Sequence, residues 1–372
     1  MKKLRKLTGI LAALTLVFAL TACGNEAEDT QDEPSKELST KEALESIEGV
    51  YYFDFEGDYK LEDCINADLK TDEELRAYFN KFVPELLGLE NRSLSLDFNS
   101  KGFACSSIVA DNAGSEGGKI YGRNFDYPEN AAMVVHTKPA KGYESLSTCY
   151  PAFVVNSADF WEPEAEVYKQ IVGTSSIFTP LDGMNEKGFY ISILQLDDET
   201  TNQTAEGKHD IQTTVAVRYL LDNADSVDKA LEILDGFNMH NVFDTAYHFA
   251  MADTKGKSVV VEYANNVKYV ADTKVVTNHY LCPESGRSKP KENDDSLIRY
   301  NTGMSAGEAA GWKMTSAQVR DALKGMSAKQ YNTDSEDKHM TIWSAVFEPA
   351  GNKVTYYFYE NYDKGVEVTF GN

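Results

Sequence analysis

The spacing of apolar residues predicts four helices, two near the N-terminus and two in the middle of the chain. Residues 41–48 and 72–87 carry apolar side chains at intervals of three and four, which is typical of a helix with one buried face. In the second segment these residues are Leu75, Tyr78, Phe79, Phe82 and Leu86. Thr213–Leu221 and Val227–Leu234 show the same period and are two further predicted helices, separated near Asp222–Asp225.

From residue 105 onward the pattern changes to short apolar or alternating segments joined by glycine-containing turns. Three hairpins are predicted: Ser106–Ala110 with Lys119–Tyr121, His248–Ala252 with Ser258–Tyr263, and Thr341–Phe347 with Val354–Tyr359. Further strands are predicted at Asn91–Phe98, Met133–His136, Phe189–Leu196 and Val275–Thr277. Many hairpins together with one helical block indicate an α+β fold, with stacked sheets and helices outside them.

The N-terminal pattern is typical of an export signal. Four basic residues within the first six positions precede the apolar run Leu7–Leu20, which is shorter than the ~20 residues of a membrane span. The following Leu20-Thr21-Ala22-Cys23 resembles a bacterial lipobox, whose cysteine receives a diacylglycerol; an ordinary signal with a chance cysteine is the alternative. We expect residues 1–22 to be removed and Cys23 to anchor the protein to the extracytoplasmic face of a bacterial cell membrane.

Composition and charge narrow the class of protein. The chain has 372 residues, 42% of them hydrophobic, which suffices for a large core. The net charge of −23 and the lack of a basic stripe argue against a nucleic-acid partner. Residues 23–40 are acidic and nearly free of large apolar groups, as expected of a flexible tether. We therefore divide the remainder into an N-terminal segment, 41–104, and a catalytic domain, 105–372.

Five cysteines are present, and their spacing indicates no metal site. Neither a CxxC pair nor a Cys/His pair at metal-ligand spacing occurs, and no cofactor is expected. With Cys23 assigned to the anchor, two disulfides would be the default in an exported protein. If Cys105 is catalytic, at most one bridge remains among Cys64, Cys149 and Cys282.

Cys105 is the candidate nucleophile because of the residues that a hairpin would place beside it. Arg123 and Asp126 lie on the strand predicted to pair with the one that carries Cys105. A guanidinium near a thiol favours the thiolate, and a carboxylate can hold an ammonium group. The alternatives are a small core cysteine and a surface ion pair.

Short motifs follow one another in a distinctive order from Cys105 onward. They begin with Cys-Ser-Ser-Ile-Val-Ala at 105–110 and Tyr-Gly-Arg-Asn-Phe-Asp-Tyr at 121–127. They continue with Gly183–Gly188 before an apolar strand, His248-Phe249 with Asp253 to Glu262, Val276-Thr277-Asn278, and Ser296–Tyr300. This order resembles that of the choloylglycine hydrolase family, whose members are N-terminal-nucleophile (Ntn) cysteine hydrolases of linear amides and include relatives of acid ceramidase. The resemblance implies a four-layer αββα sandwich of antiparallel sheets.

The resemblance also implies a role for each site residue. Cys105 would attack the carbonyl, with its own α-amino group as the base, and Asp126 would orient that amine. Arg123 would stabilise the thiolate, and Arg299 would support the nucleophile with its charge. Asn278 would donate to the oxyanion, with Gln195 as a second donor at a position where many bile salt hydrolases carry Asn. Gln195 meeting only backbone, Asn278 forming a turn and Arg299 lying on the surface remain alternatives, and His248 is interpreted as a core histidine.

Cys105 lies well inside the chain, so the resemblance to acid ceramidase implies a cut before it. Residues 23–104 would then form an α chain that stays bound to a β chain, residues 105–372. The expected substrate is a small-molecule amide of the bile-salt, penicillin V or N-acyl lipid or amino-acid type, and a homo-oligomer is left open. Aromatic residues that would line an acyl pocket, or else belong to the core, are Tyr143, Tyr150, Phe153, Phe160, Trp161, Tyr168 and Phe178.

Two other functions fit parts of this pattern. An acyltransferase of the same fold would use the same acyl-cysteine intermediate with an amine as the acceptor. A solute-binding lipoprotein would also be exported, anchored and acidic, but it requires two equivalent lobes and no cut in the backbone.

Overall fold

The computed structural model describes residues 38–89, 103–114, 118–128, 131–153, 166–328 and 339–371. These residues belong to one compact unit, Leu38–Asn372. The expected signal peptide, the lipobox with Cys23, most of the tether and the expected strand Asn91–Phe98 lie outside the described residues.

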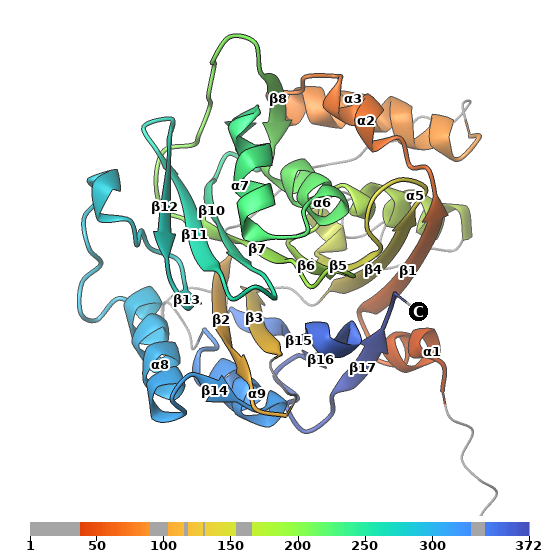
Figure 1. Cartoon of the computed structure of the whole chain (residues 1–372). Coiled ribbons are helices and arrows are strands. Elements are labelled where there is room, and N and C mark those ends of the chain that lie inside the picture. Colours follow the sequence, from red (N-terminus) through yellow and green to blue (C-terminus); the bar gives the residue numbers. More distant parts are fainter. Residues whose placement is uncertain are drawn as a thin grey trace, which may run out of the picture. The chain divides into compact units, whose positions relative to one another are not determined.

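The first of two large sheets has eight strands, and one of them comes from the N-terminal segment (Figure 1). In spatial order they are β1 (Val50–Gly57), β4 (Ala132–Pro139), β5 (Ser145–Cys149), β6 (Asp182–Asn185), β7 (Tyr190–Leu196), β10 (Ala246–Ala252), β11 (Ser258–Ala264) and β12 (Val267–Asp272). All neighbours are antiparallel except β1 and β4, which run parallel. The sheet is therefore completed by a strand from the expected α chain.

The second large sheet contains the strand that carries the candidate nucleophile as its second residue. Its order is β13 (Val275–Val276), β2 (Ala104–Asn112), β3 (Lys119–Tyr127), β15 (Met340–Glu348), β16 (Lys353–Phe358) and β17 (Val366–Thr369), and β14 (Lys313–Met314) pairs parallel with β2. A small separate sheet pairs β8 (His209–Gln212) in parallel with β9 (Phe237–His240).

Helices cover the outer face of each large sheet (Figure 1). The eight-stranded sheet is packed against α5 (Glu166–Ile177) and α6 (Thr213–Asn223), with α2 (Leu61–Ile65), α3 (Asp72–Leu86) and α7 (Val227–Asp235) beside them. The seven-stranded sheet is packed against α8 (Asp295–Ala309) and α9 (Ser316–Gly325), and α1 (Thr40–Glu45) lies beside β1 and β17. Within the described part of the chain, no helix is long and apolar enough to cross a membrane.

The four-layer αββα arrangement confirms the expected fold class, with one correction. The sheets are not wholly antiparallel, because β1 pairs parallel with β4 and β14 with β2. The predicted helices and hairpins are present. Most strands of the hairpins are longer than predicted, while β16 has the predicted length and begins one residue earlier. The helix α8 was missed because its buried side holds Ser296, Arg299, Gly303 and Gly307 rather than an apolar stripe. The described residues form one compact unit and not the two equivalent lobes that a solute-binding lipoprotein requires.

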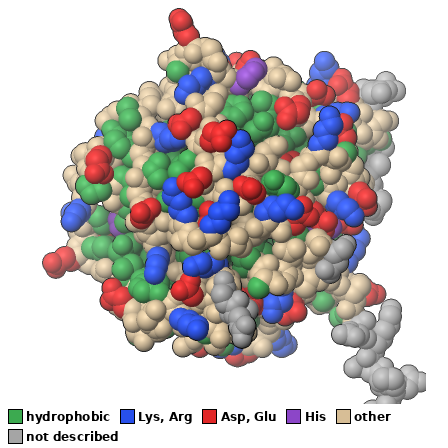
Figure 2. All heavy atoms as spheres, in the orientation of Figure 1, with side chains coloured by type: hydrophobic (Ala, Val, Ile, Leu, Met, Phe, Trp, Pro, Cys, Tyr) green, Lys and Arg blue, Asp and Glu red, His purple; other side chains and the backbone are tan. Residues whose placement is uncertain are grey.

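Charged side chains of both signs are interspersed on the face drawn in Figure 2, which shows no cluster of one sign. The main core lies largely between the two sheets and includes Phe125, Tyr190, Trp343 and Tyr356. A second apolar cluster lies where α9 packs on the seven-stranded sheet and includes Ile108, Val319, Leu323 and Val346. One face of β2 and β3 therefore packs on the main core, and the other packs on the second cluster. The side chains of the candidate site are divided between these two faces.

Candidate active site

The pairing of β2 with β3 places Cys105 in the interior. Cys105 lies opposite Phe125, and Ala104 lies opposite Asp126. Successive side chains of a strand point to opposite faces, so Arg123 and Phe125 share one face while Asp126 points to the other. Arg123 and Asp126 are both 0% exposed, and this burial excludes the alternative of a surface ion pair.

The thiol of Cys105 is enclosed while Ala104 and Cys105 remain joined. Cys105 is 0% exposed, and burial raises the pKa of its thiol to about 12. The Arg123 guanidinium beside it opposes this shift by lowering the pKa, as expected from the sequence, but burial has the larger effect. A reactive thiolate therefore requires that the residues covering Cys105 move away.

Arg123 is held between the sheets by partners on the eight-stranded sheet. Its Nε lies 3.4 Å from Asp182 Oδ2, and its Nη2 donates to the Ile193 carbonyl at 2.8 Å. Trp343 Nε1 donates to the same Asp182 oxygen at 2.9 Å. Arg123 Nη1 is buried without a nitrogen or oxygen partner among the described residues, which leaves it available to a sulfur anion. Sequence reasoning missed Asp182 because it lies 59 positions from Arg123.

Asp126 presents one bonded and one unbonded oxygen on the opposite face of β3. Its Oδ1 accepts from the Thr341 hydroxyl and, at 3.4 Å, from the Ala328 amide. Its Oδ2 is buried and has no hydrogen-bond partner among the described residues. Burial raises the pKa of Asp126 to about 6, although Arg299 and these hydrogen bonds lower it. A buried carboxylate oxygen next to the Ala104–Cys105 bond is a site for a cation.

Arg299 and Asn278 together fix the backbone of Cys105. Arg299, 2% exposed and held by Asp295, donates to the Cys105 carbonyl and to Asn278 Oδ1, the latter at 2.8 Å. The same Asn278 oxygen accepts from the Cys105 amide nitrogen at 2.8 Å. A guanidinium has no acceptor, so this contact fixes the orientation of the Asn278 amide. Arg299 is therefore no surface charge, and Asn278 is more than a turn former.

The amide nitrogen of Asn278 does not have the contact expected of an oxyanion donor. Asn278 Nδ2 donates to the Gln195 carbonyl oxygen at 2.8 Å in the uncleaved chain. Gln195 meets the backbone too, because its Oε1 accepts from the Phe103 amide at 2.6 Å. Its Nε2 has no hydrogen-bond partner among those described, and the residue is only half-buried. An amide nitrogen carries two N–H groups, and the contact with the Gln195 carbonyl uses only one of those on Asn278. Each of the two expected donors therefore keeps at least one N–H group that no described residue accepts.

Several other candidates of the sequence analysis belong to the core, whereas Tyr143 is half-buried. Phe160, Trp161 and the side chain of Tyr168 lie outside the described part of the chain. His248 is 0% exposed and contacts the Thr277 carbonyl at 2.7 Å, as expected of a core histidine. Cys64, Cys149 and Cys282 are free and buried, so the described residues contain no disulfide. Within the described ranges, no three His, Cys, Asp or Glu side chains converge as metal ligands. Tyr150 and Phe153 are buried beside Tyr127 and Phe125.

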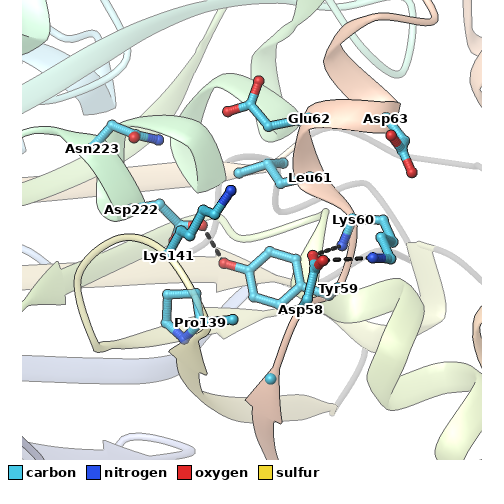
Figure 3. A pocket seen from close by; sticks show the side chains of 12 residues that line it. Asp58, Tyr59, Lys60, Leu61, Glu62, Asp63, Pro139, Lys141, Asp222 and Asn223 are labelled. Atoms are coloured by element: carbon cyan, nitrogen blue, oxygen red, sulfur yellow. Dashed lines mark hydrogen bonds and ion pairs between the residues drawn. The ribbon is translucent and has the colours of Figure 1, made fainter.

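A pocket elsewhere on the surface lacks this chemistry. It has a volume of about 360 Å³ and is lined by Gly57–Asp63, Pro139–Lys141, Asp222 and Asn223 (Figure 3). The Tyr59 hydroxyl donates to Asp222 at its base, and Asp222 is held by Arg218. No candidate site residue lines it.

Comparison with protein families agrees with the fold and with most of the motif order. Residues 113–363 match the model of the family described as acyl-coenzyme A:6-aminopenicillanic acid acyl-transferase. This match covers well over half of the chain. It begins after Cys105, so it does not itself test the nucleophile.

Individual relatives point in the same direction. A bile salt hydrolase/transferase of Clostridium perfringens is 26% identical over 185 residues, which are 46% of this chain and 51% of that protein. The match therefore spans about half the length of this curated relative. Two solved structures of variants of the conjugated bile acid hydrolase of the same organism align with TM-scores of 0.53 and 0.54. They are 15% and 14% identical and cover 72% and 71% of this chain and 92% of theirs, so they show a shared fold.

Proposed function

The chain belongs to the acyl-coenzyme A:6-aminopenicillanic acid acyl-transferase family, and from this premise we propose that it is an Ntn hydrolase that cleaves a linear amide through Cys105. The observation that carries the proposal is the surroundings of the Ala104–Cys105 bond. A guanidinium lies beside the thiol on one face, and an unbonded carboxylate oxygen lies on the other. These groups suit a thiolate and an α-ammonium group, and cleavage of that one bond frees the α-amino group beside the thiol.

The self-cleavage proposed here follows from the chemistry of the nitrogen. While Cys105 is joined to Ala104, its nitrogen is an amide and cannot act as a base. Attack of Cys105 sulfur on the Ala104 carbonyl moves the acyl group from nitrogen to sulfur, and water then opens the thioester. The freed amine has an ordinary pKa of ~7.7–8 and can serve as the base. Asn278 Oδ1 already accepts from this nitrogen, and Asp126 Oδ2 offers a second contact.

Substrate hydrolysis would repeat the same steps with an external amide. The α-amine takes the thiol proton while sulfur forms a bond to the substrate carbonyl, and the proton passes to the leaving nitrogen as the C–N bond breaks. Water then attacks the thioester, and the carboxylic acid leaves. Asn278 Nδ2 and Gln195 Nε2 are the two side-chain groups proposed to donate to the oxyanion, and Arg123 stabilises the departing thiolate. Bile-salt, penicillin V and N-acyl lipid or amino-acid amides are the proposed substrate types.

A second function, acyl transfer, is favoured by the same intermediate. The family model is that of an acyl-transferase, and the curated relative is a hydrolase/transferase by name. An amine that reaches the thioester before water would take the acyl group. Incubation of enzyme and amide with a second amine distinguishes the two outcomes, since transfer gives a new amide and hydrolysis gives only the acid.

The test of the proposed function compares two cysteines that are both fully buried. Wild-type protein should give two fragments that co-purify, with Cys105 first in the larger, and should hydrolyse one of a panel of conjugated bile salts, penicillin V and N-acyl amino acids. Cys105→Ala should remain one inactive chain. The control Cys149→Ala, also at a position 0% exposed, should be cut and active. An active Cys105→Ala protein, or an active wild-type protein with the Ala104–Cys105 bond intact, contradicts the mechanism.

A further inference from the structure

The residues on the acyl side of the scissile bond fill an apolar site next to Cys105. Phe103 is 5% exposed, and Ala104 is 6% exposed. The Phe103 ring lies between three aromatic rings, with centroid distances of 5.2 Å to Phe125, 5.6 Å to Tyr247 and 6.1 Å to Phe153. We call the space bounded by Phe125, Phe153 and Tyr247 the aromatic slot. In the uncleaved chain, the side chain of Phe103 occupies the aromatic slot.

The aromatic slot is adjacent to the groups assigned to the reaction. Phe125 lies directly opposite Cys105 in the pairing of β2 with β3, and Tyr247 lies opposite Gln195 in the pairing of β7 with β10. Gln195 also accepts from the Phe103 amide. Departure of Phe103 after the cut would therefore empty the slot and release Gln195 at the same time.

We propose that the aromatic slot is the acyl subsite of the mature enzyme, and that Phe103 marks where the acyl group of the substrate lies. This inference rests on the proposed function, because it requires that Cys105 attacks both its own amide and the external one. The same Cys105 sulfur attacks both carbonyls, and we infer that it attacks them in the same orientation. The acyl group of the substrate then extends from its carbonyl carbon in the direction that Ala104 and Phe103 take in the uncleaved chain.

The covalent path from the Ala104 carbonyl to the Phe103 ring sets the length of the acyl group. About five chain atoms separate the carbonyl carbon from the ring, a reach of roughly 7 Å for two extended residues. The three side chains of the slot carry no formal charge. The slot therefore selects an uncharged acyl group with an aromatic or apolar end several atoms from the carbonyl, such as an arylalkanoyl or medium-chain fatty acyl group. Acetyl and phenylacetyl groups are too short to fill it.

The experiment uses cleaved wild-type enzyme and four matched acyl groups: acetyl, phenylacetyl, 4-phenylbutanoyl and 6-phenylhexanoyl. Hydrolysis of their p-nitroanilides is measured, and calorimetry gives the affinity of the four free acids. We expect kcat/KM for the 6-phenylhexanoyl amide to exceed that for the acetyl amide by about 100-fold, since apolar groups buried in a pocket contribute factors of 10 or more. The acids should bind in the same order.

The two measurements separate this inference from the proposed function. If the acids bind in the expected order but no amide is hydrolysed, the slot stands and the proposed hydrolysis fails. If amides are hydrolysed but the acetyl or phenylacetyl compound is preferred, or all four are equal, the slot assignment is overturned while the hydrolase remains. An absence of any ordered binding of the acids also overturns the slot assignment.

A pair of variants locates the preference. Phe153→Leu removes one ring of the slot and should lower the ratio of 6-phenylhexanoyl to acetyl kcat/KM by about 5-fold, since an aromatic pair contributes modestly beyond its buried area. The control Phe178→Leu removes a buried ring that packs on Tyr59, Phe79 and Phe82 instead. Its ratio should equal that of the wild type. Equal ratios in both variants would place the acyl group elsewhere.

Discussion

Asp126 illustrates how a single side chain can be unfavourable before cleavage and useful after it. In the uncleaved chain its Oδ2 is buried with no hydrogen bond from any described residue, and burial raises its pKa to about 6. A carboxylate buried in this way costs free energy unless a cation pairs with it. The ammonium group of a freed Cys105 would be that cation, so we expect cleavage to remove a cost that the precursor carries.

This cost predicts a pH-dependent stability difference in the uncleaved chain. The folded-state pKa of Asp126, about 6, exceeds the ordinary carboxyl value, so the folded state binds more protons between about pH 4 and 6. Its contribution to the free energy of unfolding therefore falls as pH rises through that window and is constant above it. In a Cys105→Ala background, Asp126→Asn should raise the free energy of unfolding on the order of 2 kcal/mol at pH 7.5.

Denaturant unfolding of the two Cys105→Ala proteins at pH 4 and 7.5 checks this prediction. The advantage of Asp126→Asn should shrink towards pH 4, because the folded-state carboxyl of the parent is then protonated and carries no buried charge. A difference that is the same at both pH values would mean that Asp126 is ionised with a compensating partner in the precursor.

At the scale of the elements, the strand β1 makes the N-terminal segment part of the fold rather than a removable extension. It pairs along its whole length with β4, from Val50 opposite Ala132 to Gly57 opposite Pro139. Its Phe53 side chain is buried against Gly173 of α5, where an added Cβ would lie 2.1 Å from the ring. Hydrogen bonds and buried apolar area of this extent explain why we expect the fragments to stay together after the cut.

The contact between Phe53 and Gly173 is tested by adding one methyl group. In the Cys105→Ala background, Gly173→Ala should lower the free energy of unfolding by about 1–3 kcal/mol, because overpacking outweighs the gain in helix propensity. Gly303→Ala in α8 is the control. Its Cβ would meet mainly the flexible Met326 side chain, at 2.8 Å, so a smaller loss is expected in denaturant unfolding. An unchanged free energy of unfolding in Gly173→Ala would show that Phe53 and β1 can shift to make room for the methyl group at little cost.

At the scale of the whole molecule, the proposed anchor places the enzyme outside the cell. In the sequence, Cys23 precedes the compact unit Leu38–Asn372. We propose that the acidic segment 23–40 tethers the catalytic domain to the extracytoplasmic face of the membrane, where amides from the surroundings reach it. The support for this proposal is the basic start, the short apolar run and the lipobox-like Leu20–Cys23.

The anchor predicts a change of location from one substitution. Cys23→Ser should move the protein from the membrane fraction to the soluble or secreted fraction, because a serine cannot form the thioether to diacylglycerol. Cell fractionation and the mass of the N-terminal peptide measure this. Cys64→Ser, which changes a buried cysteine of the N-terminal segment, should leave the distribution unchanged. Membrane association of Cys23→Ser, with no lipid mass on the wild-type peptide, contradicts the proposal.

The sequence alone determined the features that depend on local pattern. The period of the apolar residues was sufficient for the helices α3, α6 and α7 and for the hairpins β2–β3, β10–β11 and β15–β16. The order of short motifs was sufficient for the family and hence for the αββα fold. The order of motifs also predicted that four residues share one site, and the structure places the other three around Cys105: Arg123, Asn278 and Arg299.

Only the tertiary structure decided the features that depend on contacts between distant segments. The ion pair of Arg123 with Asp182, the parallel pairing of β1 with β4 and the occupation of the aromatic slot by Phe103 join residues far apart in the chain. No periodicity encodes such contacts, because each one depends on how the two sheets are stacked. The burial that raises the pKa of Cys105 is likewise a property of the closed, uncleaved fold, since a thiol loses solvation only when the surrounding layers assemble.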